Sequence, residues 1–198
     1  MFERFTKDAR AVVTEAVVHA KRAGAETVEE THLLLALLDR KGSRGSFALT
    51  SLGLPARRGS VERALAEARR RGGLSRADAD ALSGLGIDLS EIVSRVEEAH
   101  GQGALKAERS GTGGGGTGRR RGLVRRSGHR PFTRGAKDLL TDSLRIALAN
   151  RDRSIGDEHL LLAITARPGV PAEVLADHGV TYESVRRVLY GGGEAKAG

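Results

Sequence analysis

The chain has 198 residues and a formal net charge of +8, a length that allows one or two domains. Aromatic residues make up 3% and tryptophan is absent, so a core has to come from leucine, valine, isoleucine and alanine, which favours helices. The absence of cysteine excludes disulfides, thiolate nucleophiles and cysteine-bound metals, and it predicts a reducing, cytoplasmic location. No apolar run approaches 18 residues and the first residues are charged, so we expect neither a membrane span nor a signal peptide.

The first helix is predicted directly behind Thr6, which has the position of an N-cap. Apolar residues then recur at intervals of three and four; they are Ala9, Val12, Val13, Ala16, Val17 and Ala20. Gly24 stops this helix, and a short apolar second helix is predicted at 32–38. Such a stripe predicts a helix with one face against a core.

A segment at about 55–78 is predicted to be an insertion in the first of two units. Val61, Leu65 and Ala68 lie near helical spacing among arginines, which favours an extra, mostly exposed helix. Further helices are predicted at 75–82, where Ser75 and Asp78 have capping-box spacing, and at 89–99.

Residues 101–130 hold eight basic residues against one acid, and 10 of the 27 glycines. This composition cannot bury enough apolar surface to offset its ordering entropy, so it predicts a disordered, basic Gly/Arg-rich linker. An arginine-rich arm can also touch phosphate backbones, so a nucleic-acid-associated protein is the alternative interpretation. The linker has no aromatic residue for base stacking, and we therefore expect only weak, non-specific contact with nucleic acid.

The residues behind the linker repeat the start of the chain. At a displacement of 127 residues, 5–42 and 132–169 share 12 identities in 38 positions without a gap. The second unit therefore predicts the same first two helices, followed by helices at 171–176 and 182–189.

Later similarities set the predicted boundaries of the units. Residues 79–82 resemble 172–175 at a displacement of 93, which predicts that the first unit holds an insertion of 34 residues. The sequence thus predicts an all-α fold of two pseudo-symmetric helical repeat units. Their expected bounds are 1–100 and 131–190, with the linker at 101–130 and a flexible tail at 191–198.

Catalytic and cofactor chemistry has little support in the sequence. The glycine run at 111–116 fits a dinucleotide pattern without the required strand before it, and 113–118 lacks the Lys and Ser/Thr of a P-loop. His32 and His159 lie at matched helix starts without a second ligand at i+4, so we interpret them as capping or packing residues and expect no metal. With no nucleophile elbow either, we expect no enzyme and no cofactor.

Several ungapped motifs, in matching order, resemble the double repeat of the Clp N-terminal domain, in particular the ClpC type of actinobacteria. They are residues 1–6, 31–35, 131–137 and above all 155–162. In that family the domain precedes two AAA+ ATPase modules that unfold proteins for the ClpP protease. Since these 198 residues contain no such module, the resemblance implies a free-standing N-domain that binds proteins without unfolding them, as an adaptor, competitor or sequestering protein.

The resemblance also implies a phosphoarginine pocket in each unit. A glutamate there meets the guanidinium, while a hydroxyl, a cation or a helix-start amide takes the phosphate. In the second unit Glu158 has the glutamate position, and Thr133 and Lys137 match the hydroxyl and the cation. The alternative interpretation makes Glu158 a helix N-terminal acid favoured by the dipole.

The first unit departs from this pattern at its glutamate position, which is Thr31. Glu30 lies one residue away, which means a rotation of about 100° along a helix. Thr6 and Arg10 take the places of the hydroxyl and the cation. We therefore expect the second pocket to be the better preserved one.

Relatives in actinobacteria bind cyclic-peptide antibiotics, and the resemblance implies such a hydrophobic ligand face here at Phe2, Phe5 and Phe132. As core or staple residues these side chains need no ligand, which is the alternative interpretation.

The resemblance thus implies a non-enzymatic protein- or peptide-binding module of the Clp chaperone–protease system. The expected partners are client or adaptor proteins, arginine-phosphorylated ones among them, and Clp ATPase or protease components, with no membrane.

Overall fold

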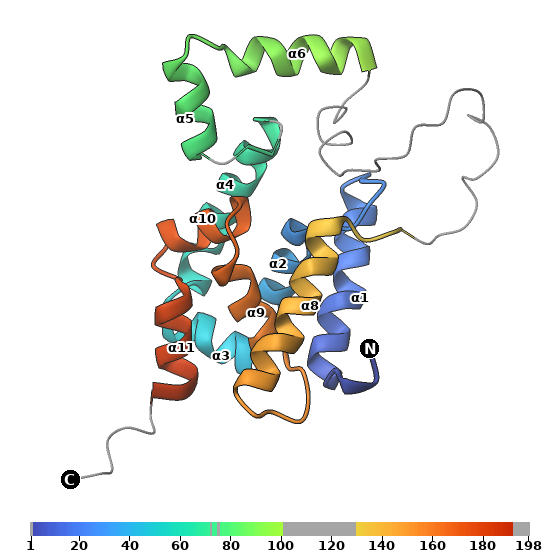
Figure 1. Ribbon diagram of the computed structural model, residues 1–198, viewed down its shortest axis with the longest axis vertical. Coiled ribbons are helices and arrows are strands. Elements are labelled where there is room, and N and C mark those ends of the chain that lie inside the picture. Colours follow the sequence, from blue (N-terminus) through green and yellow to red (C-terminus); the bar gives the residue numbers. More distant parts are fainter. Residues whose placement is uncertain (1, 72, 75, 101–129, 192–198) are drawn as a thin grey trace, which may run out of the picture.

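The computed structural model describes residues 2–71, 73–74, 76–100 and 130–191 (Figure 1). Nearly all of the predicted linker and tail lies outside these residues. Within the described ranges every regular element is a helix, which confirms the predicted all-α fold. None of these helices combines the length and the apolar character needed to cross a bilayer.

Two similar sets of helices form the body of the molecule. The first set is η1 (Phe2–Arg4), α1 (Lys7–Arg22), α2 (Glu30–Asp39), α3 (Arg44–Ser51), η2 (Pro55–Arg57) and α4 (Arg58–Arg70). The second set is α8 (Arg134–Ala149), α9 (Asp157–Ala166), α10 (Val170–Asp177) and α11 (Tyr182–Tyr190). The helices α8 to α11 start 127, 127, 126 and 124 residues after α1 to α4, respectively, so the two-repeat architecture is confirmed.

Matched caps start the first two helices of each set. The hydroxyl of Thr6 accepts from the Ala9 amide at 3.2 Å, and that of Thr133 accepts from the Ala136 amide at 3.2 Å. At the starts of α2 and α9 the buried rings of His32 and His159 accept a backbone N–H on Nδ1, at 3.0 and 2.9 Å. The interpretation of both histidines as capping residues is confirmed.

The two units are joined by a pair of symmetric backbone bridges. Phe5 pairs with Ile155, and Phe132 pairs with Val28, each through two hydrogen bonds of 2.8 to 2.9 Å. Each unit therefore ties its own first residues to the loop before the second helix of the other unit.

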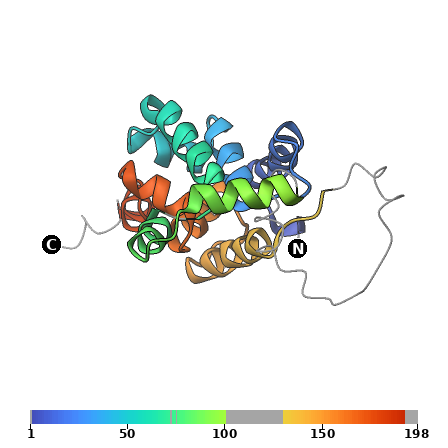
Figure 2. The same ribbon diagram turned by 90° about the horizontal axis from the view of Figure 1, so that it is seen from above.

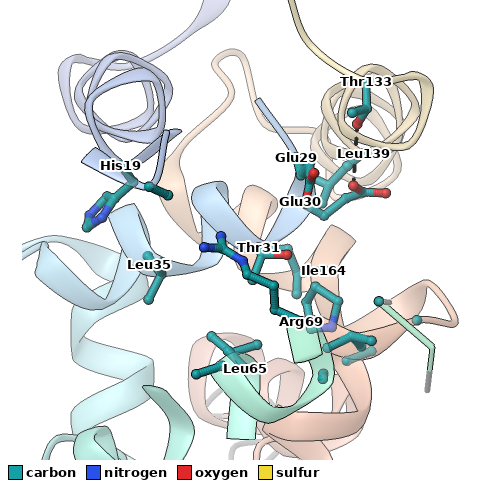
Figure 3. Close-up of a pocket in the computed structure, with 18 of the residues that line it drawn as sticks. His19, Glu29, Glu30, Thr31, Leu35, Leu65, Arg69, Thr133, Leu139 and Ile164 are labelled. Atoms are coloured by element: carbon teal, nitrogen blue, oxygen red, sulfur yellow. Dashed lines mark hydrogen bonds between the residues drawn. The ribbon is translucent and has the colours of Figure 1, made fainter. Parts of the chain in front are cut away.

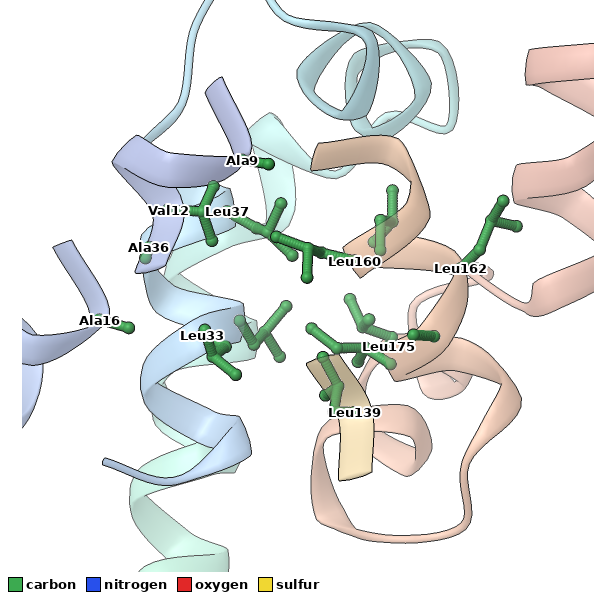
Figure 4. Close-up of a cluster of buried hydrophobic side chains, with 14 of the residues drawn as sticks. Ala9, Val12, Ala16, Leu33, Ala36, Leu37, Leu139, Leu160, Leu162 and Leu175 are labelled. Carbon is green, nitrogen blue, oxygen red and sulfur yellow. The ribbon is translucent and has the colours of Figure 1, made fainter. Parts of the chain in front are cut away.

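Both units share one hydrophobic core. Leu33 and Leu37 of α2 face Leu160 of α9, and Leu139 of α8 and Leu175 of α10 lie in the same cluster (Figure 4). α3 packs on α9 and α11 of the other unit, and α10 packs on α2 and α4. The units are thus interleaved and do not form two separate cores.

The structure corrects the place of the extra segment in the first unit. α4 exposes most of its arginines but buries Val61, Leu65 and Ala68, each at most 5% exposed, against the body. It also stands where α11 stands in the second unit, behind a left-handed glycine: Gly53 with φ +71° matches Gly179 with φ +78°. The residues at 55–78 therefore belong to the repeat itself.

The additional helices of the first unit come after the repeat. They are α5 (Arg76–Gly84) and α6 (Leu89–His100), which pack on each other at one end of the molecule (Figures 1 and 2). The amide of Arg76 ties them to α10 by donating to both carboxylate oxygens of Glu173, at 2.8 and 3.0 Å.

Candidate functional site

A cavity of about 680 Å³ lies between the two units (Figure 3). Its walls come from α1, α2 and α4 of the first unit and from α8, α9 and the first residues of α10 in the second. The apolar part of the wall is formed by Leu35, Leu65, Leu139, Ile164 and Val170. Because both repeats contribute, this cavity exists only when the units are interleaved.

One corner of the cavity carries a carboxylate beside a helix start. Glu30 at the first position of α2 reaches the N-terminus of α8, where the Thr133 hydroxyl donates to its Oε2 at 3.5 Å (Figure 3). A Cβ at residue 135 would collide with this carboxylate where it now lies, so Gly135 permits the close approach of Glu30. The partial positive charge at the start of α8 thus lies beside the Glu30 carboxylate.

Guanidinium groups line other parts of the wall. Arg69 of α4 lies with its Nη2 3.4 Å from Nε2 of His32. Arg167, behind α9, donates to Asp142 at 2.5 Å and keeps a third of its side chain exposed. The residues that line the cavity thus include three acids and three arginines around an apolar wall; they are Glu29, Glu30, Glu62, Arg22, Arg69 and Arg167.

The second predicted pocket, around Glu158, is filled by a side chain of the first unit. Arg44 at the start of α3 donates from Nη1 to Oε1 of Glu158 at 3.0 Å. Its guanidinium carbon also lies 5.6 Å from the ring centre of Tyr190, within the range of a cation–π contact. The Glu158 side chain is only 6% exposed, whereas that of Arg44 is 53% exposed.

Burial dominates the electrostatics of this pocket. It raises the pKa of Glu158 above the ordinary value, although the backbone, His159 and Arg44 act in the opposite direction. Burial, followed by the charge of Asp152, also raises the pKa of Tyr190.

The histidine beside Glu158 is fixed by its neighbours. Nδ1 of His159 accepts from the Gly156 amide, so the neutral ring carries its proton on Nε2 and donates to Asp152 at 2.9 Å. The Tyr190 hydroxyl lies 3.3 Å from the same nitrogen. His159 thus has a structural role in the wall of the pocket.

The structure pairs one of the predicted site residues with a residue of the other unit, whereas each site was expected within one unit. Thr133 meets Glu30 of the other unit, and among the described residues no hydrogen bond links it to Glu158. Arg10 and Lys137 are exposed near the starts of α1 and α8. The site at the start of α8 is therefore assembled from both repeats, which the sequence reasoning had treated as separate.

The predicted phenylalanine face is mostly structural where the structure describes it. Phe5 is 3% exposed in the shared core, and Phe132 is half-buried against it. The side chain of Phe2 lies outside the described part. The role of these residues in binding a cyclic peptide stays a prediction.

Sequence reasoning missed Arg44, Tyr190, Arg69 and Arg167. Continuing the repeat at a displacement of 126 would have matched Arg44 with Val170, and it would have placed Arg44 at the start of a helix. No pattern within the sequence places Arg69 beside His32, because that contact depends on how α4 packs.

A possible set of metal ligands among the described residues is Glu15, His19 and Asp39. Asp39 already accepts hydrogen bonds from Arg58 and from His19, the latter at 2.7 Å. Burial raises the pKa of Asp39, but these hydrogen bonds lower it below its ordinary value overall. The cluster is an ion network that ties α1, α2 and α4 together.

The fold and the cavity define a class of helical interaction domain with two interleaved repeats. The family model of the Clp repeat (R) N-terminal domain matches residues 4–77 and 131–195, well over half of the chain. This chain belongs to that family, whose domains are non-catalytic and mediate protein interactions in the Clp system. The first match ends at residue 77, before almost all of α5 and α6, in agreement with the corrected place of the extra segment.

Proposed function

We propose that this chain recognises client or adaptor proteins of the Clp system and takes a short segment of them into the cavity between its units. The observation that carries this proposal is the cavity itself, whose volume suits one or two side chains of a peptide. Its mixture of apolar wall and charged groups is typical of sites that fix a ligand by a few polar contacts.

We further propose that an arginine-phosphorylated side chain is the preferred ligand. Phosphoarginine carries a planar guanidinium group next to a negative phosphoryl group. Glu30 offers a carboxylate for the first group, and Arg69 and Arg167 offer guanidinium groups for the second. This assignment moves the main contact from Glu158, whose carboxylate already accepts from Arg44, to Glu30.

Calorimetric titration with an arginine-phosphorylated peptide and with its unphosphorylated form tests this proposal. We expect the phosphorylated peptide to bind with one site per chain, and Glu30→Gln to weaken it by about tenfold to hundredfold, since a charge-assisted contact is lost. The matched control is Glu26→Gln, because Glu26 is an exposed acid outside the cavity. Equal affinity of the two peptides, or an unchanged affinity of Glu30→Gln, contradicts the phosphoarginine assignment.

A partnership with a Clp ATPase is the second part of the proposal. The family's general role in protein binding within the Clp system supports it. Co-elution of the chain with a Clp ATPase hexamer in size-exclusion chromatography is the expected result, and separate elution at micromolar concentrations of both argues against it.

A further inference from the structure

The pseudo-symmetry of the fold gives each helix contact a counterpart in the other unit. α9, α3 and α11 meet around Glu158, and α2, α10 and α4 meet in the same way around Thr31. The pocket at Glu158 and the cavity are therefore two versions of one site.

The two versions differ at three matched positions. Glu158, Arg44 and Tyr190 correspond to Thr31, Val170 and Ala66, at displacements of 127, 126 and 124 residues. Thr31, Val170 and Ala66 all line the open cavity. The cavity is open where these side chains are short, and its counterpart is filled where an arginine and a tyrosine replace them.

The chemistry of the filled version suits a guanidinium group. A guanidinium group lies there between a carboxylate that is 94% buried and an aromatic ring, and the group comes from the chain itself. A carboxylate and an aromatic face together form a guanidinium site, since the first pairs with the charge and the second with the flat face.

We propose that Arg44 is an intramolecular ligand that keeps a second arginine site, at Glu158, closed. Arg44 competes with the arginine of any partner at a high effective concentration, because it is fixed at the start of a helix that packs on α9. Its half-exposed side chain can leave the pocket without unfolding of α3. The wild-type chain therefore uses one site, and the second opens when Arg44 is removed.

This inference rests on the proposed function for the class of ligand, and the test separates the two. The wild type, Arg44→Ala and the double variant with Glu158→Gln are titrated with the arginine-phosphorylated peptide. We expect one binding event for the wild type and two for Arg44→Ala. In the double variant, the affinity of the added event should fall by about tenfold to hundredfold.

The matched control is Arg63→Ala, which removes an exposed arginine whose described hydrogen bond is to Gly59 of its own helix. It should titrate like the wild type. If Arg44→Ala loses its helical circular dichroism, Arg44→Met replaces it, because the methionine keeps an apolar stem beside Tyr190.

The outcomes separate the two proposals. Titration of Arg44→Ala that matches the wild type, or an added event that survives Glu158→Gln, overturns the role of Arg44. A wild type that fails to bind while Arg44→Ala binds through Glu158 overturns the cavity as the site and supports Arg44 as the internal ligand.

Discussion

At the scale of residues, the buried carboxylate of Glu158 links the stability of the fold to pH. Its pKa in the folded chain is raised by burial, so the ionised form is less stable in the fold than in the unfolded chain. A group of this kind favours folding at pH values below its ordinary pKa of 4.5, and this contribution is lost as pH rises through the folded pKa.

Arg44→Ala should therefore destabilise the fold more at neutral pH than at about pH 4, where Glu158 is largely protonated. Arg44 is one of the charges that lower the pKa of Glu158, so its removal raises that pKa further and leaves an unpaired charge at neutral pH. Thermal unfolding at both pH values measures the effect. Arg63→Ala is the control, and its effect should not depend on pH. An equal loss of stability of Arg44→Ala at the two pH values would contradict this role of Arg44.

Sequence patterns predicted those residues whose role is local. Thr6, Thr133 and the two capping histidines act on atoms within four positions of themselves, so spacing along the chain was sufficient. The contact of Arg44 with Glu158 spans 114 residues and depends on interleaving, which no local pattern records.

At the scale of elements, the extra segment shows where repeat analysis failed. Residues 79–82 matched 172–175 because both segments lie in a short helix that is followed by a left-handed glycine, Gly86 or Gly179. The correct match is between 60–65 and 184–189, in which serine, valine, arginine and leucine recur at the same spacing. The decisive evidence is packing, since α4 and α11 both lie against the second helix of their own unit.

The glycines before α4 and α11 hold the turns that define this match. Gly53→Ala should lower the stability by about 1 kcal/mol, because a Cβ is strained at φ +71°. Gly59→Ala is the matched control inside α4, where the added Cβ meets open space and should stabilise by up to about 1 kcal/mol. Denaturant unfolding measures both, and a neutral Gly53→Ala argues against the strained turn.

At the scale of the whole molecule, the two units behave as one folding body because they share one core. We expect trypsin to cut first between Lys106 and Arg130, within the basic glycine-rich stretch. The two fragments should then remain associated and elute together in size-exclusion chromatography, since separation would expose leucines of α2 and α9. Separate elution of two helical fragments contradicts the interleaved arrangement.

Composition and repeats predicted the all-α fold with two repeats, because both follow from spacing along the chain. The sharing of a core could not be predicted, since each amphipathic helix is compatible with a partner in its own unit or in the other. For the same reason the cavity was missed: Glu30 and Thr133 are 103 residues apart and meet only after assembly.

The central claim is that the cavity between the units receives an arginine-phosphorylated segment. Amide chemical shifts of the isotope-labelled chain, followed during titration with the phosphorylated peptide, test it most directly. We expect the largest changes at Thr31, Arg69 and Thr133; they should saturate at one equivalent and disappear with Glu30→Gln. Largest changes on α5 and α6 or within 101–129, or no change at all, would contradict it.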